Sequence, residues 1–474
     1  MSTPPPLAGG AHGPDALRPL LATTLDALHQ GAKDRRGPLP AGGPEAVTDR
    51  VHAAAQPLLP EHGEGAETAL RTLVHALAAG TADPADPLCA AHLHCPPLAV
   101  AAAADLAASA LNPSMDSWDQ APAASALEAL LTRTLTAQIH PNGDALVTTG
   151  GTEANQLALL LAREHPTTRA PLRLLVGANA HHSLARATWL LGLPAPHVIP
   201  TPTGTLDPAA LDKALTTLPG PPGTPLVAAT AGTTDAGLID PLDDIADVCA
   251  AHATRLHIDA AYGAGLLFSD TRKHLVNGIH RAHTVTLDLH KLGWQPAAAG
   301  LLAVRDPTDL TALTHSADYL NADDDTEAGI PDLLGRSLRT TRRPDILKIA
   351  VTLKALGRQG LGALVDHVCD RAAELAALID EHPRFELHTT PTISTVLFRP
   401  THADHHDIAR LRRHLLDRGT AVLGRADLAG HRWLKATLLN PHTRTEDLTE
   451  LLARVAHHHP APTTPHPTEG TTPR

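Results

Sequence analysis

The sequence predicts an α/β protein whose large domain contains a mostly parallel sheet covered by helices on both faces. Between about residues 140 and 305, segments typical of strands alternate with segments typical of helices, as in strand–helix–strand units. The strand segments also read as nearly continuous apolar runs, which is expected where both faces of a sheet are buried. Helical segments precede this region, and a smaller α+β region follows it.

Local patterns assign the individual elements. Before the sheet, proline- and glycine-rich patches alternate with helical stretches such as DALRPLLATTLDALHQ. DALVTT predicts a strand, and a glycine turn then leads into the helix EANQLALLLAREH. PLVAATAG predicts another strand, and the helix after it is expected to start with Asp240 as N-cap and Pro241 at its first position. RLHIDAA, TVTLDL and GLLAVRD supply further strands.

Four regions are predicted along the chain. They are an N-terminal helical segment over 1–80, a large domain over 81–345, a small C-terminal α+β domain over 346–460 and a disordered tail over 461–474. Within the large domain, residues 321–345 are polar and irregular, which is typical of a long functional loop. The tail is rich in Pro and Thr and has too few apolar residues to form a core.

The composition excludes several classes of function. The 38 basic and 50 acidic residues give a formal net charge of −12, and no basic block stands out, so neither nucleic acid nor an anionic membrane is expected as a partner. The N-terminal sequence lacks the pattern of a signal peptide, and the longest apolar runs are too short to span a bilayer. The four cysteines form no CxxC pair, as suits a reducing compartment. We therefore expect a soluble, cytoplasmic protein.

The 32 histidines raise the question of a metal site. HADHH and HHH lack both the HExxH spacing and the Cys/His spacing of zinc sites. Abundant Ala, Pro, His and Leu are typical of a GC-rich genome, so no metal site is predicted.

Four motifs place chemically active residues at the ends of predicted strands. In TTGGTEAN, Gly150 and Gly151 allow close approach of a ligand, Thr152 offers a hydroxyl, and the following helix N-terminus attracts anions. The other three motifs are NAHHSLARA, LHIDAAYG and LDLHK, which carry His181, Asp259, and His290 with Lys291. Taken alone, each has an ordinary structural explanation: a glycine turn, a capping histidine, an N-cap carboxylate or a solvated lysine.

Taken together, the motifs fit a ligand with a phosphate, an aromatic ring, a basic ring nitrogen and an aldehyde. Pyridoxal 5'-phosphate has all four, and enzymes that use it pair a Schiff-base lysine with an acidic partner for the ring nitrogen. Asp259 and Lys291 are 32 residues apart, which fits one strand–helix unit that brings two strand ends to one cofactor. Because burying an unpaired ammonium is costly, Lys291 is predicted to serve imine chemistry.

The order of the motifs resembles that of the group II pyridoxal-phosphate decarboxylases. This family includes the aromatic-L-amino-acid, glutamate and 2,4-diaminobutyrate decarboxylases. The resemblance covers roughly residues 85 to 445 and rests on TTGGTEANQLALLLARE, AHHSLARA, ATAGTTDAGLIDPL, LHIDAAYGAGLL, LDLHK and LRTTRRPDILK. Through HLHCP, NPSMDSWDQ and LKATLLNP, the chain resembles in particular the bacterial branch that acts on diamino acids, including siderophore-type lysine decarboxylases. The resemblance implies a fold-type-I enzyme and a homodimer with its active site at the interface, where the N-terminal segment wraps around the partner.

The resemblance also implies a role for each motif residue. Lys291 matches the Schiff-base lysine, Asp259 the partner of the pyridine nitrogen and His181 the histidine stacked on the ring. The other implied cofactor contacts are Gly151, Thr152 and His290 at the phosphate, Gly150 in the same turn, and Thr234 and Ala261 against the ring. The implied activity is decarboxylation of an L-amino acid to an amine and carbon dioxide, in which the substrate amine displaces Lys291 and the protonated ring accepts the electrons.

One position departs from the family pattern. The aromatic branch carries a loop tyrosine that helps to protonate Cα, and Leu333 stands at the aligned position. The sequence contains two tyrosines, Tyr262 and Tyr319. Either another acid such as Lys291 or His181 protonates Cα, or the reaction is an oxidative deamination to an aldehyde. Because bacterial diamino-acid relatives also lack this tyrosine, we expect simple decarboxylation.

A basic diamino acid is the predicted substrate. Where aromatic decarboxylases line the substrate pocket with phenyl rings, this chain has NPSMDSWDQ, with Asp116 at the position of one ring and Asp119 nearby. A carboxylate there would pair with a distal ammonium, although Asp116 alternatively caps a helix or binds backbone. His94 in HLHCP is a further candidate substrate contact. Lysine, ornithine and 2,4-diaminobutyrate are not distinguished, and an aromatic or acidic substrate or a catalytically silent relative is the alternative.

Overall fold

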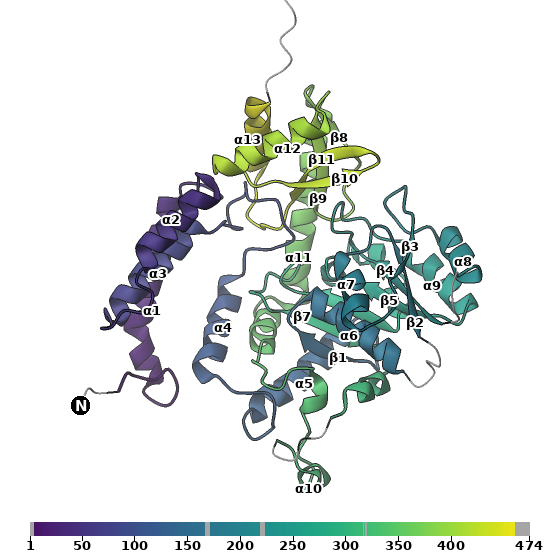
Figure 1. Cartoon of the computed structure of the whole chain (residues 1–474), viewed down its shortest axis with the longest axis horizontal. Helices are drawn as coiled ribbons and strands as arrows, with labels where there is room; N and C mark the ends of the chain where they lie inside the picture. The colour runs from purple at the N-terminus through teal and green to yellow at the C-terminus, as the bar shows by residue number, and fades with distance from the viewer. Residues whose placement is uncertain (1–3, 166–170, 219–222, 316, 318–319, 460–474) are drawn as a thin grey trace, which may run out of the picture.

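The computed structural model describes residues 4–165, 171–218, 223–315, 317 and 320–459. It contains an N-terminal helical arm, a large domain and a small domain (Figure 1). Tyr319 and the predicted disordered tail over 461–474 lie outside the described residues.

Three helices form the N-terminal arm: α1 (Gly13–Arg35), α2 (Gly43–Ala55) and α3 (Ala66–Gly80). Helices α1 and α3 pack along each other, and Figure 1 shows the arm standing beside the rest of the chain. Arg35 at the end of α1 donates a hydrogen bond to the carbonyl of Ala78 at 2.8 Å and forms an ion pair with Asp83. Two further helices, α4 (Ala99–Leu111) and α5 (Pro122–Thr136), lead into the large domain.

The large domain is built on a seven-stranded sheet with the order β1-β7-β6-β5-β4-β2-β3. The strands are β1 (Asp144–Thr148), β2 (Leu172–Gly177), β3 (His197–Ile199), β4 (Thr224–Thr230), β5 (Arg255–Asp259), β6 (Thr284–Asp288) and β7 (Gly300–Val304). Among these strands, β7 alone runs antiparallel to its neighbours, β1 and β6. The prediction of a mostly parallel sheet is therefore confirmed.

Helices cover both faces of this sheet, as predicted. Alternate residues of β4 divide between the faces: Val227 and Ala229 pack in the core that includes α5, α9 and α11, whereas Leu226 and Ala228 pack against α6 and α7. The connecting helices are α6 (Gly151–Glu164), α7 (His182–Leu190), α8 (Pro208–Thr216) and α9 (Leu242–Ala251), with the 3-10 helices η1 (Gly263–Phe268), η2 (Lys273–Val276), η3 (Ile279–Arg281) and η4 (Pro307–Leu313).

The predicted cap of α9 is wrong. The helix begins at Leu242, its N-cap is Pro241, and no side chain caps it. The carboxylate of Asp240 instead accepts hydrogen bonds from the backbone N–H groups of Thr230 at 2.7 Å and Leu206 at 2.8 Å. Burial raises the pKa of this carboxyl group, and its bonds tie the end of β4 to the segment before α8.

The segment predicted as an irregular loop, 321–345, contains the short helices α10 (Asp323–Glu327) and η5 (Leu334–Arg336). The long helix α11 (Ile346–Asp380), interrupted at Gly357, then leads into the small domain. That domain contains an antiparallel sheet of order β10-β11-β9-β8 with two helices: β8 (Phe385–Leu387), β9 (Thr395–Pro400), α12 (His405–Asp417), β10 (Gly424–Leu428), β11 (His431–Thr437) and α13 (Thr445–His458).

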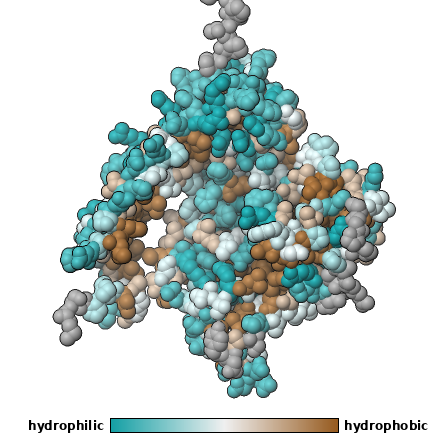
Figure 2. All heavy atoms as spheres, in the orientation of Figure 1, coloured by the Kyte–Doolittle hydropathy of each residue, from teal (hydrophilic) through white to brown (hydrophobic). Residues whose placement is uncertain are grey.

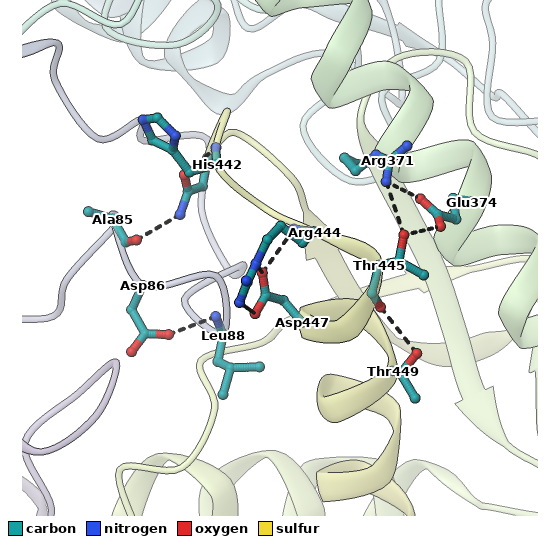
Figure 3. A network of polar contacts seen from close by, with 11 residues as sticks. Ala85, Asp86, Leu88, Arg371, Glu374, His442, Arg444, Thr445, Asp447 and Thr449 are labelled. Carbon is teal, nitrogen blue, oxygen red and sulfur yellow. Dashed lines mark hydrogen bonds and ion pairs between the residues drawn. The ribbon is translucent and has the colours of Figure 1, made fainter.

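Polar contacts hold the small domain to the rest of the chain (Figure 3). At the start of α13, Thr445 Oγ1 donates to Glu374 Oε1 on α11 at 2.6 Å, and Glu374 pairs with Arg371 at 2.5 Å. Asn440 Nδ2 donates to the carbonyl of Ala85 at 2.7 Å. These bonds anchor α13 both to α11 and to the segment that precedes α4.

Candidate active site

A cavity of about 360 Å³ lies where the carboxyl ends of β4, β5 and β6 meet. It is lined by all the residues predicted to contact the cofactor: Gly150, Gly151, Thr152, His181, Thr234, Asp259, Ala261, His290 and Lys291. The remaining lining residues are Leu93, Thr149, Asn155, Thr230, Gly232, Tyr262 and Asp288. Neighbouring parallel strands end at one edge of a sheet, which is why motifs far apart in the sequence meet here.

Two glycines allow the turn between β1 and α6 to approach the sheet. A Cβ on Gly151 would lie 2.9 Å from the Cβ of Ala261, and a Cβ on Gly300 would lie 2.5 Å from the Cα of Gly150. Sequence analysis identified Gly151 but missed Gly300. The role of Gly300 follows from register, because this residue pairs with Thr148 of β1 on one side and Asp288 of β6 on the other.

Asp288 organises the end of the cavity next to the start of α6. It is 4% exposed, and its Oδ2 accepts a hydrogen bond from the backbone N–H of Gly151 at 2.9 Å. Its Oδ1 lies 2.5 Å from His290 Nδ1. The N–H of Gly151 therefore has a carboxylate partner within the protein, while Thr152 and the Nε2 atom of His290 remain for an anion.

Asp259, at the end of β5, also lines the cavity and is 5% exposed. Its Oδ1 accepts from the backbone N–H of Ala261 at 3.1 Å, and its Oδ2 accepts from Asn155 Nδ2 at 2.8 Å. Asn155 also donates to Ser183 Oγ at 2.8 Å. Sequence analysis missed Asn155, although a buried amide among the apolar residues of EANQLALLLARE was a usable signal.

These contacts belong to a polar strip on the face of β5 and β6 that meets α6. The strip consists of His257, Asp259, Thr284, Thr286 and Asp288, all of which are buried. The intervening residues, Leu256 and Ile258 on β5 and Val285 and Leu287 on β6, belong to the apolar core on the other face. The description of these two strands as continuous apolar runs is therefore wrong, because polar and apolar residues alternate.

Burial controls the charge of the imidazoles near the cavity. It lowers the pKa of His181, while the nearby Asp259 carboxylate acts in the opposite direction. Burial also lowers the pKa of His257 to about 4. Both rings are therefore neutral at neutral pH. The ring of His94 is exposed and lies 5.9 Å from the ring of His290, beside the cavity.

Neither Tyr262 nor Leu333, the residue at the position of the loop tyrosine, supplies a free hydroxyl to this cavity. Tyr262 lines it, but its hydroxyl contacts Ser394 Oγ at 2.8 Å and Thr395 Oγ1 at 3.1 Å in the small domain. Burial raises the pKa of Tyr262 to about 12. Leu333 is buried and lines a different cavity, next to α5.

The two candidate aspartates for substrate binding lie elsewhere in the chain. Asp116 is buried, and its Oδ1 accepts from Gln120 Nε2 at 2.8 Å. Asp119 is exposed, and its Oδ1 accepts from Ser117 Oγ at 2.6 Å. Neither lines the cavity that contains Lys291. Asp116 also does not cap α5, whose N-cap is Ala121.

The residues around the cavity fit pyridoxal phosphate. The glycine positions leave a cradle that a Cβ would fill, and the N-terminus of α6, Thr152 and the imidazole of His290 provide hydrogen-bond donors for a phosphate. The buried carboxylate of Asp259 can pair with a protonated ring nitrogen. Lys291 forms no salt bridge within the described part of the chain. No group of three or more His, Cys, Asp or Glu side chains suited to a metal ion occurs among the described residues.

Comparison with known proteins gives consistent findings. The family described as "Pyridoxal-dependent decarboxylase conserved domain" matches residues 50–401. The L-2,4-diaminobutyrate decarboxylase of Rhizobium meliloti (strain 1021) is 40% identical over 413 residues, covering 83% of this chain and 82% of the relative. The enzyme of the same name from Acinetobacter baumannii is 31% identical over 429 residues, covering 83% and 84%.

A solved structure extends the similarity to the fold. It is the glutamate decarboxylase domain of diaminobutyrate-pyruvate transaminase and L-2,4-diaminobutyrate decarboxylase from Vibrio parahaemolyticus. The TM-score is 0.84 at 30% identity, and the match covers 95% of this chain and 97% of that one. None of the described helices is both long and apolar enough to cross a membrane.

Proposed function

Because the chain belongs to the pyridoxal-dependent decarboxylase family, and is a pyridoxal-phosphate-dependent amino-acid decarboxylase, we propose that its substrate is a diamino acid, L-2,4-diaminobutyrate in particular. The observation that carries this proposal is the 40% identity, over 413 residues, to a protein named for that activity. A second relative with the same name supports it. The products are the corresponding diamine and carbon dioxide.

The residues of the cavity divide this work. Pyridoxal phosphate supplies a protonated ring that accepts electrons when it is bound. Lys291 Nζ binds the cofactor covalently and later releases the product, and Asp259 holds the ring nitrogen in its protonated form. Thr152 and His290 Nε2 hold the phosphate, and the Asp288 carboxylate fixes the orientation of His290.

Two groups in the cavity supply the proton at Cα in this proposal, Lys291 Nζ and the Nε2–H of His181. Tyr262 is not assigned this role because its hydroxyl is bound to Ser394 and Thr395. Decarboxylation, rather than oxidation to an aldehyde, is the proposed outcome.

We also propose that the enzyme works as a homodimer. Several leucines of the N-terminal arm remain exposed, including Leu25 at 64% and Leu77 at 68%, and Figure 2 shows apolar side chains gathered on the arm. Asp116 and Asp119 do not line the cavity of their own chain, so roles for them in substrate binding require the site of a second subunit. Sedimentation should show a dimer, and paired Leu25→Glu and Leu77→Glu substitutions should weaken it.

We place the enzyme in the cytoplasm. All four cysteines are free thiols, and burial raises the pKa of each to about 12, so they are poor candidates for disulfide exchange. Cell fractionation with a marker enzyme tests this location.

A panel of amino acids tests the substrate. Carbon dioxide release should be fastest with L-2,4-diaminobutyrate, slower with ornithine and lysine, and lowest with glutamate and aromatic amino acids. Product mass separates amine formation from aldehyde formation, which would also release ammonia. An absence of carbon dioxide from every amino acid, together with a colourless protein after incubation with pyridoxal phosphate, would indicate a catalytically silent relative.

Asp116→Ala refines this panel. If the carboxylate pairs with the distal ammonium, kcat/KM for 2,4-diaminobutyrate should fall by about 10- to 150-fold, the range for one charged hydrogen bond. An uncharged analogue, 2-aminobutyrate, should be affected little. Equal losses with both substrates would show that Asp116 is structural.

A further inference from the structure

We propose that Asn155 is a positioning residue that joins Asp259 to His181 and determines which nitrogen of His181 carries the proton. This inference rests on the proposed function, because it concerns how the side chains that face the cofactor are held. Asn155 itself lies on α6, one turn beyond Gly151, at the edge of the cavity. It is 1% exposed, so every bond that its amide forms is made within the protein.

The amide of Asn155 uses its full hydrogen-bonding capacity. Its Nδ2 donates to Asp259 Oδ2 and to Ser183 Oγ, both at 2.8 Å. Its Oδ1 accepts from Thr286 Oγ1 at 2.7 Å and from His257 Nε2 at 3.0 Å. A primary amide has two N–H donors and two acceptor lone pairs, so four partners saturate it.

Chemistry fixes the direction of each bond. The carboxylate of Asp259 only accepts, so Nδ2 must face it and Oδ1 must face β5 and β6. The Nε2 atom of His257 is then the protonated nitrogen, since Oδ1 only accepts. Its Nδ1 accepts from Thr284 Oγ1 at 2.9 Å. The low pKa of His257, caused by burial, agrees with this neutral ring.

The same logic extends to His181. Ser183 Oγ accepts from Asn155 and lies 2.8 Å from His181 Nδ1, to which it donates if that nitrogen is an acceptor. The backbone N–H of Ser183, which can only donate, also points to that nitrogen at 3.3 Å, so Nδ1 is an acceptor. With two donors on Nδ1, the neutral imidazole carries its proton on Nε2, the atom that is left for the cavity. The charged and titratable groups that face this ring are Asp259, His182 and Lys291.

One amide therefore holds both the acidic partner of the cofactor ring and the imidazole of His181. Protonation of His181 at Nδ1 requires the Ser183 hydroxyl to turn away, and that hydroxyl is held by Asn155. The network thus keeps Asp259 aimed at the ring nitrogen and keeps an N–H, rather than a lone pair, facing the reacting carbon or the substrate carboxylate.

Asn155→Ala is the principal test, and Asn179→Ala is its matched control. Asn179 also binds a buried aspartate, since its Nδ2 donates to Asp240 Oδ1 at 2.8 Å, but it lies outside the cavity. Loss of one hydrogen bond to a charged group predicts a fall in kcat of about 10- to 150-fold for Asn155→Ala, with KM changed little. Asn179→Ala should lower only the melting temperature.

Two readouts separate positioning from stability. The pH titration of the visible absorbance of the bound cofactor should shift to higher pH in Asn155→Ala. A ring with less positive charge raises the pKa of the imine nitrogen that joins the cofactor to Lys291. The pH profile of kcat/KM should gain an acidic limb near the ordinary histidine pKa of about 6.5, because His181 is freed to accept a proton at Nδ1. The absorbance readout works even if the enzyme decarboxylates a different amino acid, so it tests Asn155 independently of the proposed substrate.

Ser183→Ala tests the contact to His181 separately from the contact to Asp259. It also provides a test of the proposal if Asn155→Ala does not fold. It keeps the hydrogen bond from Asn155 to Asp259. It removes the Ser183 hydroxyl, which contacts both Asn155 and His181. It should produce the acidic limb without moving the absorbance titration. An unchanged pH profile in Ser183→Ala would overturn the assignment for His181. Identical behaviour of Asn155→Ala and Asn179→Ala would show that Asn155 is structural.

Discussion

The two faces of strands β5 and β6 are both buried but carry different kinds of side chain. On one face, Leu256, Ile258, Val285 and Leu287 pack into an apolar core with α9 and α11. On the other face, the polar strip meets α6, and its side chains bond one another, Asn155 and the cavity. Both faces are buried to a similar degree, so burial does not distinguish them.

The difference teaches what each face is for. An apolar face gains stability in proportion to the area that it buries, whereas a buried polar group costs stability unless it finds a partner. Leucines and valines in place of the polar strip would therefore stabilise the fold more. Its benefit is to hold charge and protons at fixed places beside the cavity, so mutations on this face should change chemistry more than stability.

The largest effect is expected from Lys291→Ala, at the end of the strand that carries the polar strip. Activity should fall on the order of 10³-fold or more, as for removal of a covalent catalytic group, with little change in melting temperature. Borohydride reduction and peptide mapping should find the cofactor on Lys291 in the wild type. Lys273 provides a control, because it is exposed and paired with Asp270. A label on Lys273 would contradict the assignment.

Asp259→Asn should have the next largest effect. The side chains are similar in size, so the strip stays packed, but the charge that keeps the ring nitrogen protonated is lost. Turnover should fall by roughly two orders of magnitude or more, while the unfolding free energy changes little. Steady-state kinetics and denaturant unfolding measure the two quantities on the same sample. Near-normal turnover would show that this carboxylate serves only the fold.

Acidification should destabilise the protein through the polar strip. His257 has a folded pKa of about 4 against an ordinary value near 6.5, because burial opposes its charge. Between these values the unfolded chain binds a proton that the folded chain does not, so the unfolding free energy falls by about 1.4 kcal/mol per pH unit as pH drops, and this contribution is constant above pH 6.5.

Denaturant titrations from pH 7.5 to 4.5 measure that slope. Burial also lowers the pKa of His140 to about 4 and that of His283 to about 3, so these groups add to the wild-type slope. His257→Gln should reduce the slope by one proton and leave the rest. An identical slope in wild type and variant would mean that His257 is protonated in the fold or does not titrate in this range.

The sharpest comparison uses adjacent residues that face opposite sides. Val285→Thr places a hydroxyl in the apolar core and should lower the unfolding free energy by about 1–3 kcal/mol, with normal kcat per folded molecule. Thr286→Val removes a donor to Asn155 and should reduce kcat with a smaller loss of stability. Kinetics and unfolding of both variants decide the matter, and the reverse pattern would refute the distinction between the faces.

The fold class and most cavity-lining residues could be predicted from the sequence because short local patterns specify both. A glycine turn before a helix, and Asp, His and Lys at strand ends, are visible within eight residues, and Gly151, Asp259 and Lys291 line one cavity. Gly300 and Asn155 were not found because a decisive partner of each lies more than 100 residues away in the sequence, Thr148 for Gly300 and Asp259 for Asn155. Such pairs depend on strand order, which local patterns do not specify.

Some information was present in the sequence and was misread. TVTLD and LHID alternate polar and apolar residues, the signature of a strand with two unlike faces, but the apolar residues dominated the interpretation. Asp240 before a proline resembles a helix cap, yet its carboxylate binds Thr230 and Leu206, which only the folded chain brings together. Asp116 stays a prediction because its proposed role requires a second subunit.

The place of β7 between β1 and β6 sets the order of events during biosynthesis. Asp144 of β1 pairs with Val304 of β7, so the sheet closes only after a long stretch of chain has been made, and contacts of such high sequence separation form slowly. Until Gly300 is in place, the turn that carries Gly150 has no strand to rest on and Gly151 is not held against Asp288. We therefore expect a nascent chain to lack a complete cofactor site until residue 304 has been synthesised, so that binding of the cofactor would report completion of the sheet.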